Sequence, residues 1–181
     1  MTRQPAAKSA KDLDLSLDHE SFVAGLLRAL TGTLEDVLGL EEASDFISIV
    51  GGTVGKAINK EYKTALQVDR LTQEQVTEVL IDLKRRIGGD FFVIEEDREK
   101  IVLGNRRCPF GARVHDRPSL CMMTSNVFGH IVAENLGYAT VELRETIASG
   151  AHGCRVVIYL TPTPEADKSG GRNYRRVSRS P

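Results

Sequence analysis

Three cysteines are the residues of this sequence whose type and placement best suit chemistry. Cys108 and Cys121 bound the segment "CPFGARVHDRPSLC", and 32 residues separate Cys121 from Cys154 in "SGAHGCRVVIYL". Zinc fingers hold their ligands in close pairs such as C-x2-C, and these spacings differ from that pattern. Each cysteine nevertheless falls where a predicted strand or helix begins or ends, so side chains from distant segments can meet there. The placement therefore predicts one site that all three cysteines share.

A tetrahedral zinc or an iron–sulfur cluster usually takes four ligands, and either is the cofactor that such a site would hold. We assign His152 as the fourth ligand because it lies in a turn two residues before Cys154. His115 is the other histidine in a turn near a cysteine. The turn residues Phe110 and Gly111 are expected to contact the bound group.

The remaining histidines fit a metal site poorly. His130 lies nine residues after Cys121, which places it on the opposite side of the same predicted helix. His19 lies far away in the first predicted helix.

Other uses of the cysteines stay open. Buried free cysteines often serve as small core residues. The positive end of a helix lowers the pKa of a thiol, which favours Cys121 as a reactive group at a helix start. A cysteine-dependent hydrolase is a further alternative. It would take its residues from Cys108 or Cys121, His115 or His152, and Glu142 or Glu145.

Composition bounds the class of protein. With 181 residues, 41% of them apolar, the chain can bury the core of one domain. A formal net charge of -1 argues against a nucleic-acid surface over the whole domain. No segment has the length of a transmembrane helix, and the N-terminus lacks the apolar region of a secretory signal. We expect a cytoplasmic protein with reduced thiols and no membrane partner.

Apolar periodicity predicts three helices in the first half of the chain. The first begins at Asp18, and Gly32 and Gly39 interrupt its pattern. The second covers roughly residues 41–62. The third starts at the N-cap Thr72 and ends at the glycine pair 88–89.

The second half has the texture of a sheet with one helix. The runs "DFFVIEED" and "KIVLGNRR" predict a β-hairpin. Pro118 and Ser119 open a helix that reaches about Leu136. "YATVELRETI" and "CRVVIYLTP" predict two further strands. The fold class is therefore α+β, with three N-terminal helices followed by a ββ-α-ββ unit that forms an antiparallel sheet.

The two ends of the chain are polar. Residues 1–17 are expected to form a flexible arm, residues 18–161 a single domain, and residues 162–181 a disordered basic tail. The tail is the one segment that could contact nucleic acid.

The segment "GGTVGK", residues 51–56, looks briefly like a phosphate-binding loop. It lacks the required spacing between its glycines and the Gly-Lys pair, and it lies within a helical pattern. The glycines are better explained by close packing of two helices.

Cys-Pro-Phe-Gly at 108–111, Leu-Cys at 120–121 and the Gly-x-x-Gly-Cys approach to the last strand resemble the methanogen output domain family (the MetOD1 type). The resemblance covers about residues 18–161 and extends to cysteine-bearing four-vinyl-reductase-type domains and to cysteine-rich halves of iron–sulfur transcription regulators. It implies a ligand-binding or output module of a signalling protein.

These observations favour a signalling or regulatory domain that binds a metal, a cluster or a small ligand at the three cysteines. Its expected partner is another signalling protein or a second copy of the chain. The alternatives are the small cysteine-dependent enzyme and a structural module that dimerises through its front helices.

Overall fold

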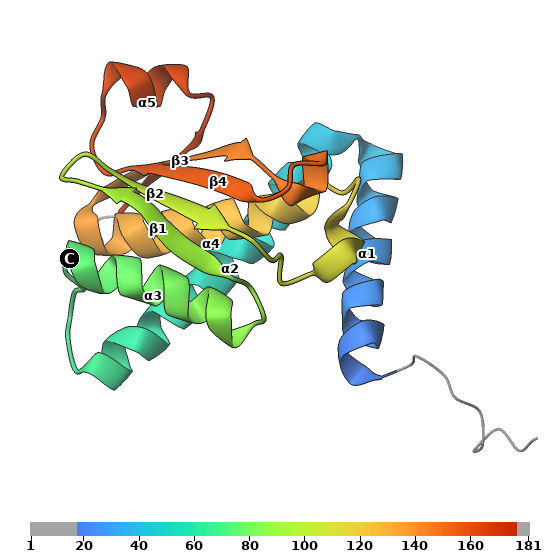
Figure 1. Ribbon diagram of the computed structural model, residues 1–181, viewed down its shortest axis with the longest axis horizontal. Helices are drawn as coiled ribbons and strands as arrows, with labels where there is room; N and C mark the ends of the chain where they lie inside the picture. The colour runs from blue at the N-terminus through green and yellow to red at the C-terminus, as the bar shows by residue number, and fades with distance from the viewer. Residues whose placement is uncertain (1–17, 177–181) are drawn as a thin grey trace, which may run out of the picture.

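The computed structural model describes residues 18–176, and the helices come first (Figure 1). α1 (His19–Leu38), α2 (Leu40–Leu66) and α3 (Gln73–Arg86) precede a mixed second half. That half contains, in order, β1 (Phe91–Glu96), β2 (Lys100–Asn105), a 3-10 turn (Gly111–Val114), α4 (Ser119–Leu136), β3 (Tyr138–Glu145), a second 3-10 turn (Ile147–Ser149), β4 (Cys154–Tyr159), α5 (Pro164–Lys168) and β5 (Arg172–Arg175). The predicted α+β class with an antiparallel sheet is confirmed.

The local signals explain where the helices begin and end. Asp18 and Thr72 are N-caps with complete capping boxes, which satisfy the free N–H groups of α1 and α3. Gly39 has a φ of 87°, a conformation that favours glycine, and it divides the front helical run into α1 and α2. Gly137, with a φ of 100°, ends α4 in the same way.

The five strands form one antiparallel sheet in the order β1-β2-β4-β3-β5. Side chains alternate between its faces. On one face Ile101, Leu103 and Ile158 join the main core with residues of α3 and α4. On the other, Val102 and Tyr159 pack with Ala166 of α5. Figure 1 shows α4, α2 and α3 on one side of the sheet and α5 on the other.

Glycines of α2 allow this helix to lie against α4. A Cβ on Gly51 would stand 2.7 Å from the Asn126 Cβ, and one on Gly55 would stand 3.1 Å from the backbone of Val127. The His130 ring occupies the corresponding space over Gly52. The glycines of residues 51–56 therefore serve helix packing, as the sequence predicts, and form no phosphate-binding loop.

The predicted disordered tail is wrong for residues 162–176. β5 pairs with the edge of β3, with Ala139 opposite Tyr174. Tyr174 belongs to the main core and its hydroxyl lies 3.1 Å from Ser125 Oγ. The Tyr174 ring, the free edge of β3 and the hydrogen bonds that Arg172 and Arg176 donate hold this segment in place, although its composition is polar. Residues 177–181 and the predicted arm, residues 1–17, lie outside the described residues.

α1 and α2 carry apolar side chains that the described fold leaves exposed. They are Phe22, Val23, Leu26, Leu27, Leu30, Val37 and Leu38 on α1, and Leu40, Phe46, Ile49, Val50, Val54 and Leu66 on α2. We call these residues the exposed front face. Across residues 18–176, no helix is both long enough and apolar enough to span a bilayer.

Candidate ligand cavity

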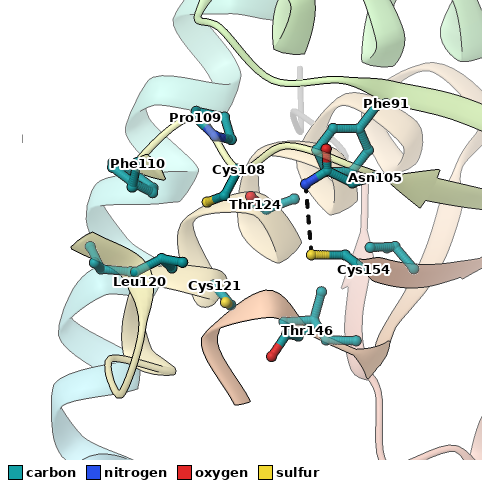
Figure 2. A pocket seen from close by; sticks show the side chains of 13 residues that line it. Phe91, Asn105, Cys108, Pro109, Phe110, Leu120, Cys121, Thr124, Thr146 and Cys154 are labelled. Atoms are coloured by element: carbon teal, nitrogen blue, oxygen red, sulfur yellow. Dashed lines mark hydrogen bonds between the residues drawn. The ribbon is translucent and has the colours of Figure 1, made fainter. Parts of the chain in front are cut away.

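All three cysteines line one cavity, at the end of the sheet where β2 stops and β4 begins. Its wall consists of Phe91, Asn105, Cys108, Pro109, Phe110, Val114, Leu120, Cys121, Thr124, Leu143, Thr146, Cys154 and Val156. Figure 2 shows the sulfur atoms of the three cysteines arranged around this space. Sequence reasoning therefore selected residues that the fold brings to the same place.

Each cysteine reaches the cavity from a different element. Cys108 lies in the loop after β2, Cys121 in the first turn of α4, and Cys154 at the start of β4. Asn105 is the register partner of Cys154, and its side-chain N–H donates to the Cys154 Sγ at 3.7 Å (Figure 2). The backbone N–H of Ile147 donates to the same sulfur at 3.5 Å. These two donors fix the Cys154 side chain at the cavity wall.

The cavity lies where two apolar clusters meet. Cys154 packs against the main core. Cys108 and Cys121 pack against a smaller cluster built on Val114, Leu120 and Ala148. Packing between separate clusters is less complete than packing within one core, so this boundary is a natural place for a void.

The cavity is small in this conformation. Its volume is about 30 Å³, and one water molecule needs roughly 10–15 Å³ by the same measure. A ring-sized molecule therefore fits only if part of the wall moves. The loop between β2 and α4 forms most of the wall that lacks strand or long-helix hydrogen bonding, so it is the segment best able to move.

Burial makes two of the thiols poor nucleophiles. It raises the pKa of Cys121 to about 12 and also raises the pKa of Cys108. This shift is opposite in direction to the one that the start of α4 would favour for Cys121. Loss of hydration is the largest cause of the raised pKa of Cys121, because burial disfavours the charged thiolate.

The predicted metal-ligand set does not assemble. Between residues 18 and 176, no group of three or more His, Cys, Asp or Glu side chains is arranged to hold a metal ion. His152 is exposed and is absent from the cavity wall, as is His115. Of the two turn residues, Phe110 lines the cavity, whereas Gly111 is exposed outside it.

The hydrolase alternative also lacks its base. None of the described histidines lines the cavity. Glu142 accepts hydrogen bonds from Arg144 and from the Tyr159 hydroxyl on the opposite, α5-covered face. A cysteine–histidine–acid arrangement is therefore not formed in this conformation.

Lys84 is the charged residue that sequence reasoning missed. It lies on α3, is 4% exposed, and its ammonium donates to Thr124 Oγ1 at 2.7 Å. The nitrogen also stands 5.5 Å from the ring centre of Phe91 and 5.1 Å from that of Phe128. Burial lowers its pKa to about 8, and the three cysteines are close enough to influence it. A buried cation therefore stands directly behind the cavity wall.

α1 holds the cavity loop through two polar side chains. The Arg28 guanidinium donates to the carbonyl oxygens of Arg113 and His115, the latter at 2.7 Å. Glu35 pairs with Arg117 at 3.5 Å and accepts from the Ser119 backbone N–H at 3.2 Å. The second contact places a carboxylate at the N-terminus of α4, where it stabilises the helix.

The sequence matches the family model of methanogen output domain 1 over residues 26–159. The chain belongs to this family. The match runs from within α1 to the end of β4 and includes all three cysteines and Lys84, so these residues lie inside the methanogen output domain. No curated protein matches the chain.

Solved structures share the fold of this methanogen output domain at low sequence identity. The phenol-responsive sensory domain of the transcription activator PoxR, in complex with phenol, matches with a TM-score of 0.65 and 15% identity, covering 85% of this chain and 80% of that chain. Trafficking protein particle complex subunit 3 from Naegleria fowleri, covalently bound to palmitic acid, matches with a TM-score of 0.55 and 11% identity, covering 87% and 99%.

Proposed function

We propose that this protein is a sensory or regulatory domain that takes a small organic molecule, held mainly by apolar contacts, into the cysteine-lined cavity. The cavity carries the proposal: an apolar wall with few polar groups, at the boundary of two packed clusters, is typical of a small-molecule site. The family and the two similar folds agree with this choice, since one of those proteins is described with phenol and the other with palmitic acid.

The signal would leave the cavity through α1. A molecule that widens the cavity displaces the loop after β2, and this loop is hydrogen-bonded to Arg28 and Glu35. α1 also presents part of the exposed front face. The arrangement thus connects a cavity that must widen on binding with a helix that exposes apolar side chains.

Phenol is the probe that tests this function. Backbone amide NMR spectra of the full chain are recorded during a phenol titration, with Cys121→Leu as a variant that fills the cavity. Met122→Leu is the matched control, because the neighbouring residue on α4 does not line the cavity. We expect saturable shifts around Cys121, Thr124 and Cys154 in the wild type and the control, and none in Cys121→Leu. Shifts that persist unchanged in Cys121→Leu would refute the site.

A second copy of the chain is the partner that we propose for the exposed front face. The observation behind it is the number of large apolar side chains on α1 and α2 that remain exposed, because contiguous patches of this kind usually mark contacts with other proteins. Sedimentation velocity over a range of protein concentrations tests this proposal. A dimer is expected, and a monomer at all concentrations would contradict it.

A further inference from the structure

Lys84 has no counter-ion within the described structure. An ammonium group has three N–H donors, and the one hydrogen bond of Lys84 goes to a neutral hydroxyl. No Asp or Glu between residues 18 and 176 pairs with it. The thiols of Cys108 and Cys121 provide no negative charge at neutral pH, since burial raises both of their pKa values.

The aromatic rings offset only part of the cost of this charge. The ring faces of Phe91 and Phe128 attract the ammonium, but such contacts are weaker than a buried ion pair. Because the pKa of Lys84 lies at about 8, most of the molecules carry the charge at neutral pH. The fold thus buries the Lys84 ammonium, which is mostly protonated at neutral pH, at a position where an anion could pair with it.

Thr124 connects this charge to the cavity. Its oxygen accepts from Lys84, so its own hydroxyl hydrogen must find another acceptor. The hydrogen bonds of the described residues include no such acceptor. Thr124 lines the cavity and lies among the cysteines in Figure 2. A donor with a cation behind it therefore faces the space that the ligand would fill.

We propose that the cavity selects small organic acids, bound as carboxylates through the Thr124 hydroxyl and the charge of Lys84. The apolar wall would hold the hydrocarbon part of the acid. This inference rests on the proposed function and names the ligand class of the same site. The carboxylate supplies the missing counter-ion, and the hydroxyl of Thr124 supplies a direct hydrogen bond to it.

Matched pairs of probes test the selectivity. Benzoate and benzamide have nearly the same shape, as do butyrate and butyramide, but only the acids are charged at pH 7. The Kd of each is measured by NMR titration of the full chain. We expect benzoate and butyrate to bind at least about tenfold more tightly than their amides, since a buried charge pair contributes more than a neutral hydrogen bond.

Two variants test whether Lys84 and Thr124 cause the preference for the acid over the amide. Lys84→Met keeps the length and apolar stem of the side chain, and Thr124→Val keeps the shape of the threonine. Lys84→Met should remove the advantage of the acid while leaving the Kd of the amide nearly unchanged, whereas Thr124→Val should weaken the binding of both probes and reduce the advantage of the acid. The second variant keeps the test intact if the first does not fold.

The outcomes separate this inference from the function on which it rests. Equal affinity for acid and amide in the wild type, with shifts at the cavity, would overturn the role of Lys84 and leave the cavity function standing. An acid advantage that survives in both variants would also overturn it. No cavity shifts with any probe, phenol included, would overturn the proposed function and this inference together.

Discussion

The sheet half (α3, α4 and the strands) and the front half (α1 and α2) of this protein use their apolar residues in opposite ways. In the sheet half, residues such as Ile101, Ile158 and Phe128 are fully buried between strands and helices. In the front half, Phe22 and Ile49 are 59% and 70% exposed. The first pattern stabilises the fold, and the second leaves surface free for another molecule. The cavity is walled by residues of the sheet half, and Arg28 and Glu35 of α1 hold the loop beside it, so a bound molecule could affect both halves.

The largest effect on stability is expected in the short C-terminal strand, β5. Tyr174 of β5 packs under α4 and is 7% exposed. Replacing Tyr174 with Ala should lower the free energy of unfolding by about 3–5 kcal/mol, as for other large buried aromatic residues. Urea denaturation followed by circular dichroism measures the change. A loss below about 1 kcal/mol would show that the sheet half does not depend on β5.

The buried charge of Lys84 should make stability depend on pH. Its folded pKa of about 8 lies below its ordinary value of 10.5, so between these values the unfolded chain binds more protons than the folded one. Stability due to this group therefore rises with pH over that window, by about 3 kcal/mol in total. Lys84→Met has no such group. The stability advantage of Lys84→Met over the wild type should shrink by about that amount between pH 8 and pH 10.5.

The cysteines facing Lys84 act in the opposite direction. The pKa values of Cys108 and Cys121 are raised by burial, so their stabilising effect is present below the unfolded thiol pKa and is lost as the pH rises toward the folded values. Cys154 also lies near the ammonium. Both proteins retain all three thiols, so the difference between them reports Lys84. A difference that is independent of pH would contradict the buried charge.

Substitutions at two glycines compare how tightly the two halves are packed. A Cβ on Gly129 of α4 would stand 2.2 Å from the Tyr174 ring, whereas a Cβ on Gly25 of α1 meets nothing within 4 Å. Gly129→Ala should destabilise the protein by about 1–3 kcal/mol through overpacking. Gly25→Ala should stabilise it by roughly 0.5–1 kcal/mol through helix propensity. Thermal unfolding of both variants gives the comparison, and equal signs would contradict it.

The smallest expected effect on stability belongs to the exposed front face. Ile49→Lys should change the free energy of unfolding of the monomer by less than about 0.5 kcal/mol, because the side chain makes few contacts. The same change should weaken self-association in sedimentation velocity. A large loss of monomer stability would show that this face is part of the core of each chain.

The sequence was sufficient for most of the fold because its signals were local. Capping boxes, glycine stops and alternating strands predict α3, α4, the β1–β2 hairpin and strands β3 and β4, which the structure confirms. β5 has four residues and one apolar side chain, so its formation depends on the free edge of β3. No local pattern carries that information.

The residues of the cavity could be predicted only in part from the sequence, for a similar reason. The cysteines at the ends of helices and strands predict where the cavity lies. The predicted metal-ligand set also included His152, which the fold leaves exposed and outside the cavity wall. Lys84 follows Leu80 by four residues, so helical periodicity does place it on the buried face of α3. Because Lys84 is charged and precedes the exposed Arg85 and Arg86, the sequence alone suggests that its side chain is exposed as well. Only the positions of Thr124 and the aromatic rings explain its burial.

Hydrogen exchange of α1 shows whether the cavity is coupled to this helix. A molecule in the cavity should change how Arg28 and Glu35 hold the loop after β2, and should therefore change α1. Exchange is measured by mass spectrometry on peptides from residues 19–38 and 106–121, with and without saturating phenol. We expect altered exchange in both segments for the wild type and for Met122→Leu, and in neither for Cys121→Leu. Binding of phenol at the cavity with unchanged exchange throughout α1 would contradict this coupling.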